Sequence, residues 1–158
     1  MVSPIKGGIA NRRYNKTLHG RSVYRKMDVP GHNVVLGYSS PGVGDGLDIF
    51  TNAGEPVFAM HGGRINRIAD RNGRLACIYI AGKDMTTVYA HLHIHEKIRL
   101  GTVVREGECI GWVGRKLKDP HLHLEAWTGG KCISAKTPAQ LAVKIGQIIA
   151  ASLSNILS

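Results

Sequence analysis

Two histidines separated by one apolar residue, His121 and His123, are the side chains of this sequence best suited to chemistry. In an extended strand they lie on the same face, because successive side chains point to opposite faces. His91 and His93 repeat this spacing in a second segment. Adjacent imidazoles can bind a transition metal or transfer protons near neutral pH. The spacing therefore predicts a metal or acid–base site at which two histidine-bearing strands meet.

A carboxylate from a third segment extends this set of donors. Asp48 lies near the start of a strand-like segment, residues 46–50. Zinc takes histidine nitrogens and carboxylate oxygens as ligands, and a catalytic zinc keeps one position open for water or substrate. Asp48 and histidines of two other strands are therefore a suitable donor set for an open zinc site.

The composition is typical of one globular domain. The 158 residues include 20 glycines but only 2 phenylalanines, which suits short strands joined by tight turns. The three cysteines form no CxxC pair, so neither a disulfide framework nor a cysteine zinc site is expected. No apolar run is long enough to span a bilayer. The first residues lack the apolar segment of a secretory signal peptide, so we expect a protein made in the cytoplasm without one.

Positive charge is concentrated near the N-terminus. The formal net charge is +10 at pH 7, and residues 1–30 hold seven basic side chains against one acidic side chain. Such a segment attracts polyanions, among them nucleic acid, teichoic acid and acidic protein surfaces. A solvated terminal segment has the same composition. We interpret residues 1–30 as a basic extended arm with little structure of its own.

Strand signals fill the middle of the chain, and a helix signal ends it. Short apolar or alternating segments recur between glycine-rich turns, with Asn72-Gly73 as the strongest hairpin signal. They predict a mostly β domain over residues 31–137, a compact antiparallel sheet with a groove. Apolar residues at helical spacing predict a C-terminal amphipathic helix over residues 138–158. This helix either packs on its own sheet or docks into a neighbouring subunit.

Five landmarks, in order along the chain, resemble the lysostaphin-like (LytM-type) zinc metalloendopeptidases, which cleave peptide cross-links in bacterial peptidoglycan. The resemblance runs from about His32 to about Pro138. The landmarks are Gly46-Leu47-Asp48-Ile49, Glu55-Pro56-Val57-Phe58-Ala59 with Gly63, Thr87-Val88-Tyr89-Ala90-His91-Leu92, residues 101–114, and Pro120-His121-Leu122-His123-Leu124-Glu125. The resemblance implies a lysostaphin-like fold, a zinc cofactor and peptidoglycan as the substrate.

The resemblance also implies a role for each matching residue. Asp48 and His123 would be zinc ligands. His91 and His121 would be the catalytic histidines, one acting as general base and the other orienting the substrate or stabilising the developing oxyanion.

The sequence departs from the family pattern at one ligand. The family places a histidine four residues before the aspartate, and here that position is Gly44. Glycine has no side chain with which to bind a metal, so two of the usual three protein ligands remain. Asp45 could replace the missing ligand if a β-bulge turned it inward. His32 and His61 are further alternatives, each from a neighbouring segment.

Other candidate residues have a structural interpretation. His93 and His95 continue the alternation of His91 in the way that any half-exposed strand would. Glu125 is interpreted as a structural residue or as a partner of a ligand rather than as a catalytic group. Trp112 and Trp127 are interpreted as aromatic residues of the core or of a groove wall.

The sequence supports three hypotheses for function. The favoured one is a peptidoglycan-directed domain with zinc chemistry weakened or lost at Gly44, as a subunit of a phage tail or a similar wall-penetrating assembly. In such a virion its arm and helix would bind other subunits. The second is an active zinc endopeptidase with a substitute third ligand. The third is a basic nucleic-acid-binding or structural virion protein, which the absence of a recognisable reading helix or basic aromatic motif does not favour.

Overall fold

The structure is a computed structural model that describes residues 1–10, 12–16, 46–69, 75–115, 120–133 and 135–157. Gly44, Asp45 and His32 lie outside the described residues. The described part of the chain folds into ten strands and one helix. The strands are β1 (Tyr14–Lys16), β2 (Leu47–Phe50), β3 (Pro56–Phe58), β4 (Gly63–Ala69), β5 (Ala76–Ala81), β6 (Thr86–Ile94), β7 (Val103–Val104), β8 (Cys109–Val113), β9 (His121–Thr128) and β10 (Lys131–Cys132).

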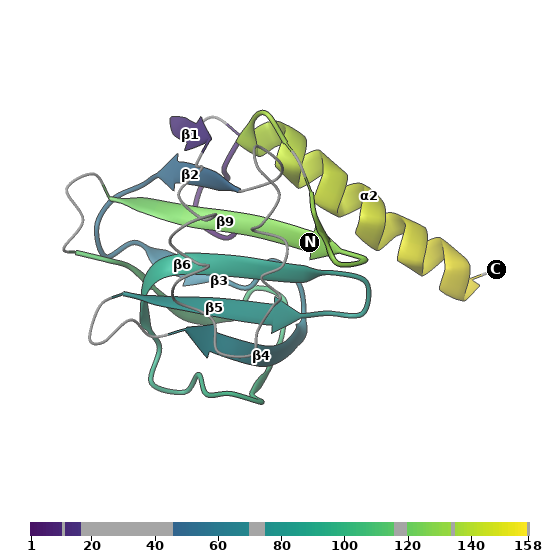
Figure 1. Ribbon diagram of the computed structural model, residues 1–158, viewed down its shortest axis with the longest axis horizontal. Helices are drawn as coiled ribbons and strands as arrows, with labels where there is room; N and C mark the ends of the chain where they lie inside the picture. The colour runs from purple at the N-terminus through teal and green to yellow at the C-terminus, as the bar shows by residue number, and fades with distance from the viewer. Residues whose placement is uncertain (11, 17–45, 70–74, 116–119, 134, 158) are drawn as a thin grey trace.

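The strands form one antiparallel sheet, in the order β1-β2-β9-β6-β5-β4-β7. β10 pairs with β9, and β8 pairs with both β3 and β6. Figure 1 shows β2, β9, β6, β5 and β4 side by side, so segments distant in the sequence meet at β9. The prediction of a mostly β, antiparallel fold is confirmed.

β9 lies between β2 and β6 and presents two different faces. One face is part of the apolar core, where three β9 side chains are completely buried: Leu122, Leu124 and Ala126. The opposite face carries the alternate residues, which are His121, His123, Glu125 and Trp127. The core therefore fixes the face to which the polar row points, because a shift by one residue would exchange the two sets.

The first residues pack against the sheet. Ile5 and Ile9 are buried in the core, with exposed fractions of 1% and 4%. The Val2 amide donates to the Met60 carbonyl oxygen at 3.1 Å, and β1 pairs with β2. This differs from the expectation of an arm with little structure, and the reason is burial: two isoleucines of the segment find an apolar surface on the domain. Residues 17–30 of the predicted arm lie outside the described part.

α2 (Pro138–Leu157) is the C-terminal helix that the sequence predicted. Pro138 occupies the first helical position, and the Thr137 hydroxyl accepts a hydrogen bond from the Gln140 amide at 3.1 Å, as a helix N-cap does. Leu141 and Ile145 are buried against the sheet, so this part of the helix packs on its own domain. Figure 1 shows the C-terminal half extending beyond the strands. No helix among the described residues is long and apolar enough to cross a membrane.

Candidate active site

Strand register brings the candidate residues together from three strands. Asp48 of β2 lies opposite His123 of β9. Ala90 of β6 lies opposite the same His123 from the other side. His121 pairs with Phe50 at the end of β2. The predicted site therefore forms at one end of β9, where β2 and β6 flank it.

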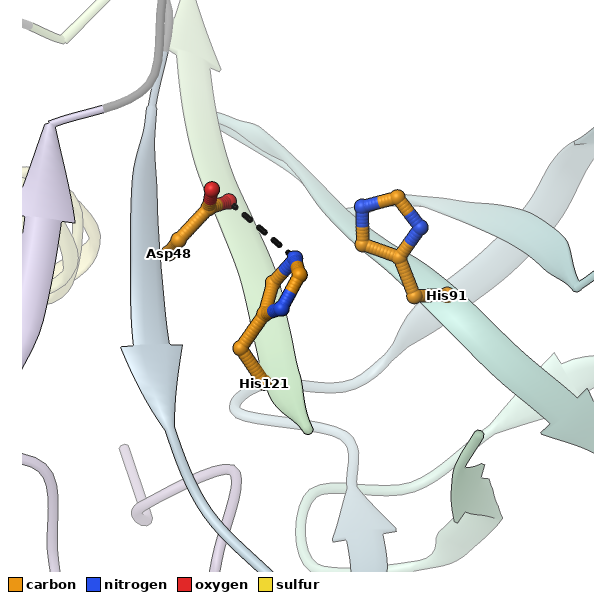
Figure 2. Close-up of side chains that lie close together, drawn as sticks. All are labelled: Asp48, His91 and His121. Atoms are coloured by element: carbon orange, nitrogen blue, oxygen red, sulfur yellow. Dashed lines mark ion pairs between the residues drawn. The ribbon is translucent and has the colours of Figure 1, made fainter. Parts of the chain in front are cut away.

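Asp48 is the centre of this cluster. Its Oδ1 lies 2.9 Å from His123 Nδ1 and 3.7 Å from His121 Nε2. Its side chain is 13% exposed and that of His121 is 16% exposed, whereas His123 is completely buried. Figure 2 shows the Asp48 carboxylate directed toward the His121 ring, with the His91 ring on the adjacent strand. Asp48 and His121 are therefore partly exposed side chains of the cluster, and His123 is a buried one.

His91 reaches the site through an irregularity of β6. By strict alternation it would point to the face opposite Ala90. Its backbone instead has φ +68°, a left-handed conformation that residues other than glycine rarely adopt. The β5–β6 register also shifts beside it. The result places the His91 ring 4.7 Å from the His121 ring and 6.0 Å from the His123 ring, centroid to centroid.

The imidazole of His123 lies between two carboxylates. Its Nδ1 faces Asp48 Oδ1, and its Nε2 lies 2.6 Å from Glu125 Oε1. Burial alone would lower the pKa of His123, but the hydrogen bonds to Asp48 and Glu125 and the charges of both carboxylates raise that pKa to about 9. In the metal-free protein at neutral pH, His123 is therefore protonated.

The donor set fits a zinc ion. One ligand atom each from Asp48, His91 and His121 lies within 4.8 Å of the others, and His123 Nδ1 lies against the same carboxylate of Asp48. Histidine nitrogens and a carboxylate oxygen are ligands that zinc takes in proteins. The four residues that the sequence selected, Asp48, His91, His121 and His123, thus meet at one place.

The other histidines of the described part lie outside this cluster. His93 is exposed and accepts a long hydrogen bond from the Arg115 amide, at 3.5 Å. His95 stacks on Trp112, with ring centroids 5.3 Å apart. His61 is buried, and its Nε2 lies 2.8 Å from Thr87 Oγ1. His61 is thus engaged elsewhere and is not the substitute ligand.

Two features near the site were not predicted. Trp127 Nε1 donates a hydrogen bond to Glu125 Oε2 at 2.8 Å. The sequence held a signal for this contact, because alternate residues of a strand share a face and His121, His123, Glu125 and Trp127 are alternate residues. The Phe50 ring lies 6.2 Å from the His121 ring, and the Arg13 guanidinium lies 4.5 Å above Phe50. No sequence signal links Arg13 to this place, because its position depends on the pairing of β1 with β2.

Comparison with known proteins identifies a family for the chain. The sequence model of Peptidase family M23 matches residues 42–135, more than half of the chain. No curated protein sequence matches the chain significantly.

Solved structures with a similar fold include three from bacteria. A zinc-containing peptidase from Vibrio cholerae is 25% identical, with a TM-score of 0.50 over 59% of this chain and 30% of that one. Csd3 from Helicobacter pylori is 20% identical, with a TM-score of 0.52 over 98% of this chain and 42% of that one. Lysostaphin from Staphylococcus simulans is 26% identical, with a TM-score of 0.46 over 60% of this chain and 39% of that one. The chain thus matches less than half of the length of each of these structures.

Proposed function

Because the chain belongs to Peptidase family M23, we propose that it is a peptidoglycan-directed metallopeptidase domain in which Asp48 and His123 hold a zinc ion. The observation that carries the proposal is the 2.9 Å contact between Asp48 Oδ1 and His123 Nδ1, with two further histidine rings beside it. A zinc ion held there would polarise a peptide carbonyl and would lower the pKa of a water molecule to about 7.

His91 and His121 are the acid–base pair of this proposal. Both rings border the partly exposed side of Asp48, and their centroids are 4.7 Å apart. A neutral imidazole has one acceptor nitrogen and one N–H donor, so one ring can accept a proton from water while the other donates a hydrogen bond to a substrate oxygen. Asp48 Oδ1, 3.7 Å from His121 Nε2, orients that ring.

Gly44 weakens the metal site in this proposal. A catalytic zinc usually has three protein ligands, and the family's histidine is absent at this position. The loss of even an outer partner of a ligand typically costs about 10–100-fold in metal affinity or activity, and the loss of a ligand should cost more. We therefore expect zinc to bind, but more weakly than in a site with the full set.

Zinc content decides this proposal. Purified protein is dialysed against a zinc buffer and analysed by elemental mass spectrometry. The expected result is zinc that is lost in Asp48→Ala and in His123→Ala, and that binds more tightly in Gly44→His, which restores the family's ligand. His93→Ala is the matched control, because His93 lies on the same strand as His91 but outside the cluster. A Gly44→His variant without any gain in zinc affinity would contradict the role given to Gly44.

A second candidate is an active endopeptidase with a complete, rearranged ligand set. The observation that favours it is the mutual approach of Asp48, His91 and His121 within 4.8 Å. In that arrangement His91→Ala and His121→Ala would remove the zinc. In the first arrangement these two variants would keep the zinc and lose hydrolysis of peptidoglycan peptides. Zinc content and hydrolysis, measured on the same four alanine variants, separate the candidates.

The place of the domain in a larger assembly stays a prediction from the sequence. A phage tail or a similar wall-penetrating particle would use the basic N-terminal segment and α2 as contacts to other subunits. Nucleic-acid binding is the competing interpretation of the positive charge, and it would show a steep dependence on salt concentration.

A further inference from the structure

Glu125 is a buried carboxylate to which the proposed function gives no task. It is 1% exposed and lies on β9 two residues after His123. Its two oxygens have different partners: Oε1 lies 2.6 Å from His123 Nε2, and Oε2 accepts the indole N–H of Trp127 at 2.8 Å. A carboxylate is costly to bury without such partners. The chain retains this one directly behind a proposed zinc ligand.

The backbone of Gly46 holds Glu125 in place from the other side. Gly46 has φ +93°, and a Cβ at this position would lie 2.6 Å from Glu125 Cγ and 3.2 Å from His123 Cε1. The side chain of Glu125 therefore packs directly on the main chain that leads to Asp48. Packing and the Trp127 hydrogen bond together fix where its Oε1 lies.

The position of Oε1 determines which nitrogen of His123 can bind a metal. A neutral imidazole carries one proton, and the nitrogen without it is the metal donor. A carboxylate can only accept a hydrogen bond, so Glu125 keeps the proton on Nε2. In the metal-free protein Nδ1 also carries a proton, which faces Asp48. Because Glu125 holds the proton on Nε2, the Nδ1 proton is the one that a metal ion shared with Asp48 would displace.

We propose that Glu125, locked by Trp127, is a positioning residue that directs His123 Nδ1 toward the metal. The metal part of this inference rests on the proposed function. Hydrogen-bond partners on metal-binding histidines fix the tautomer and raise the basicity of the ligand. Here the partner is itself held by a second hydrogen bond, so the indole of Trp127 acts on the zinc ligand through Glu125.

The substitution Glu125→Gln tests this arrangement without removing volume. The new amide must turn its oxygen to the Trp127 N–H, because two N–H donors cannot face each other. Its NH₂ group then donates to His123 Nε2, so the neutral imidazole keeps its single proton on Nδ1, the nitrogen that would bind the metal. With Trp127→Phe added, the amide is free to turn its oxygen to His123 instead. The double variant should therefore recover what Glu125→Gln loses.

Zinc affinity, measured by competition with a chromogenic chelator, gives the first readout. We expect Glu125→Gln to bind zinc about 10–100-fold more weakly, Trp127→Phe to lose much less, and the double variant to regain most of the affinity. Glu125→Gln and the double variant both lack the negative charge of Glu125. Recovery of zinc affinity in the double variant would therefore show that the imidazole tautomer, and not the charge, determines the affinity. Glu55→Gln is the control: Glu55 is another hydrogen-bonded carboxylate, with its side chain 11% exposed, but its partners are Arg12 and the Asn52 amide. Urea unfolding checks that all variants fold.

A second readout needs no metal. In ¹H–¹⁵N spectra of the metal-free protein, the His123 Nε2–H should be visible in the wild type, absent in Glu125→Gln and visible again in the double variant. A Glu125→Gln protein that keeps this proton and binds zinc like the wild type would overturn the inference. A double variant without recovery would overturn the part given to Trp127. If the wild type takes up no zinc, the proposed function fails, and the ring proton alone then decides the inference.

Discussion

His91 shows how a single residue can depart from its sequence pattern and thereby enter the site. Its backbone has a left-handed φ of +68°. In a residue with a Cβ this conformation costs on the order of 1–2 kcal/mol of free energy. Such strain is typical of functional sites, where the surrounding structure maintains it. The Gly114 amide donates to the His91 carbonyl oxygen at 2.9 Å, which helps to hold the irregular backbone.

The strain at His91 leads to a prediction for stability. His91→Gly should have a free energy of unfolding about 1 kcal/mol higher than His91→Ala, because glycine adopts positive φ without a steric penalty. Under the proposed function both variants should also lose peptide hydrolysis, since neither has an imidazole at this position. Urea unfolding of the metal-free proteins measures the difference. Equal stabilities for the two variants would show that the left-handed backbone is not maintained in solution.

The residue scale also shows where sequence reasoning succeeds and where it stops. Alternation along β9 predicted that His121 and His123 share a face, and burial of Leu122 and Leu124 on the opposite face fixes it. Alternation does not predict the bulge that carries His91 to them, because the bulge depends on β6 leaving β9 to pair with β8. The sequence does not predict the contact of Glu125 with Gly46 either, since this contact depends on the register of β2 against β9.

At the scale of elements, a buried polar chain links the start of β4 to β6. His61 Nδ1 lies 2.8 Å from the Gly62 carbonyl oxygen, which can only accept, so His61 Nε2 accepts from the Thr87 hydroxyl. The Tyr89 hydroxyl lies 2.8 Å from Thr87 Oγ1 and accepts from the Met60 amide at 2.9 Å. Burial of His61 in this chain favours its neutral form.

This chain predicts a loss of stability in acid. Burial lowers the pKa of His61, which outweighs the raising effects of its hydrogen bond to Gly62 and of Glu106. Below pH 6.5 the unfolded state binds the proton more readily than the folded state, so the contribution of His61 is complete above about pH 6.5 and is lost as the pH falls.

The measurement is urea unfolding of wild type and His61→Gln at pH 7.5 and pH 5. The wild type should lose more stability on acidification than His61→Gln, which has no imidazole to protonate at this place. His123 cannot imitate the result, because its raised pKa has the opposite sign: its contribution is present below pH 6.5 and is lost as the pH rises through about 9. Parallel losses in both proteins would contradict the prediction.

At the scale of the whole molecule, the folded unit is larger than the segment that the family model matches. That segment comprises residues 42–135, yet Ile5 and Ile9 from the N-terminal segment and Leu141 and Ile145 from α2 belong to the same apolar core. The helix was predictable, since its apolar residues recur at helical spacing. The packing of the N-terminal segment was not, because two isoleucines among basic residues and glycines show no periodicity.

Because Ile5 is buried in that shared core, Ile5→Ala should lower the free energy of unfolding of the whole domain. The expected loss is about 2–5 kcal/mol, which is typical of a large buried aliphatic residue replaced by alanine. Leu100→Ala is the matched control, because Leu100 is 69% exposed and its loss should stay within about 0.5 kcal/mol. Urea unfolding followed by tryptophan fluorescence measures both. A loss in Ile5→Ala as small as in Leu100→Ala would mean that the N-terminal segment is a detachable arm, free to bind other subunits of an assembly. A large loss would mean that the segment completes the apolar core of the domain.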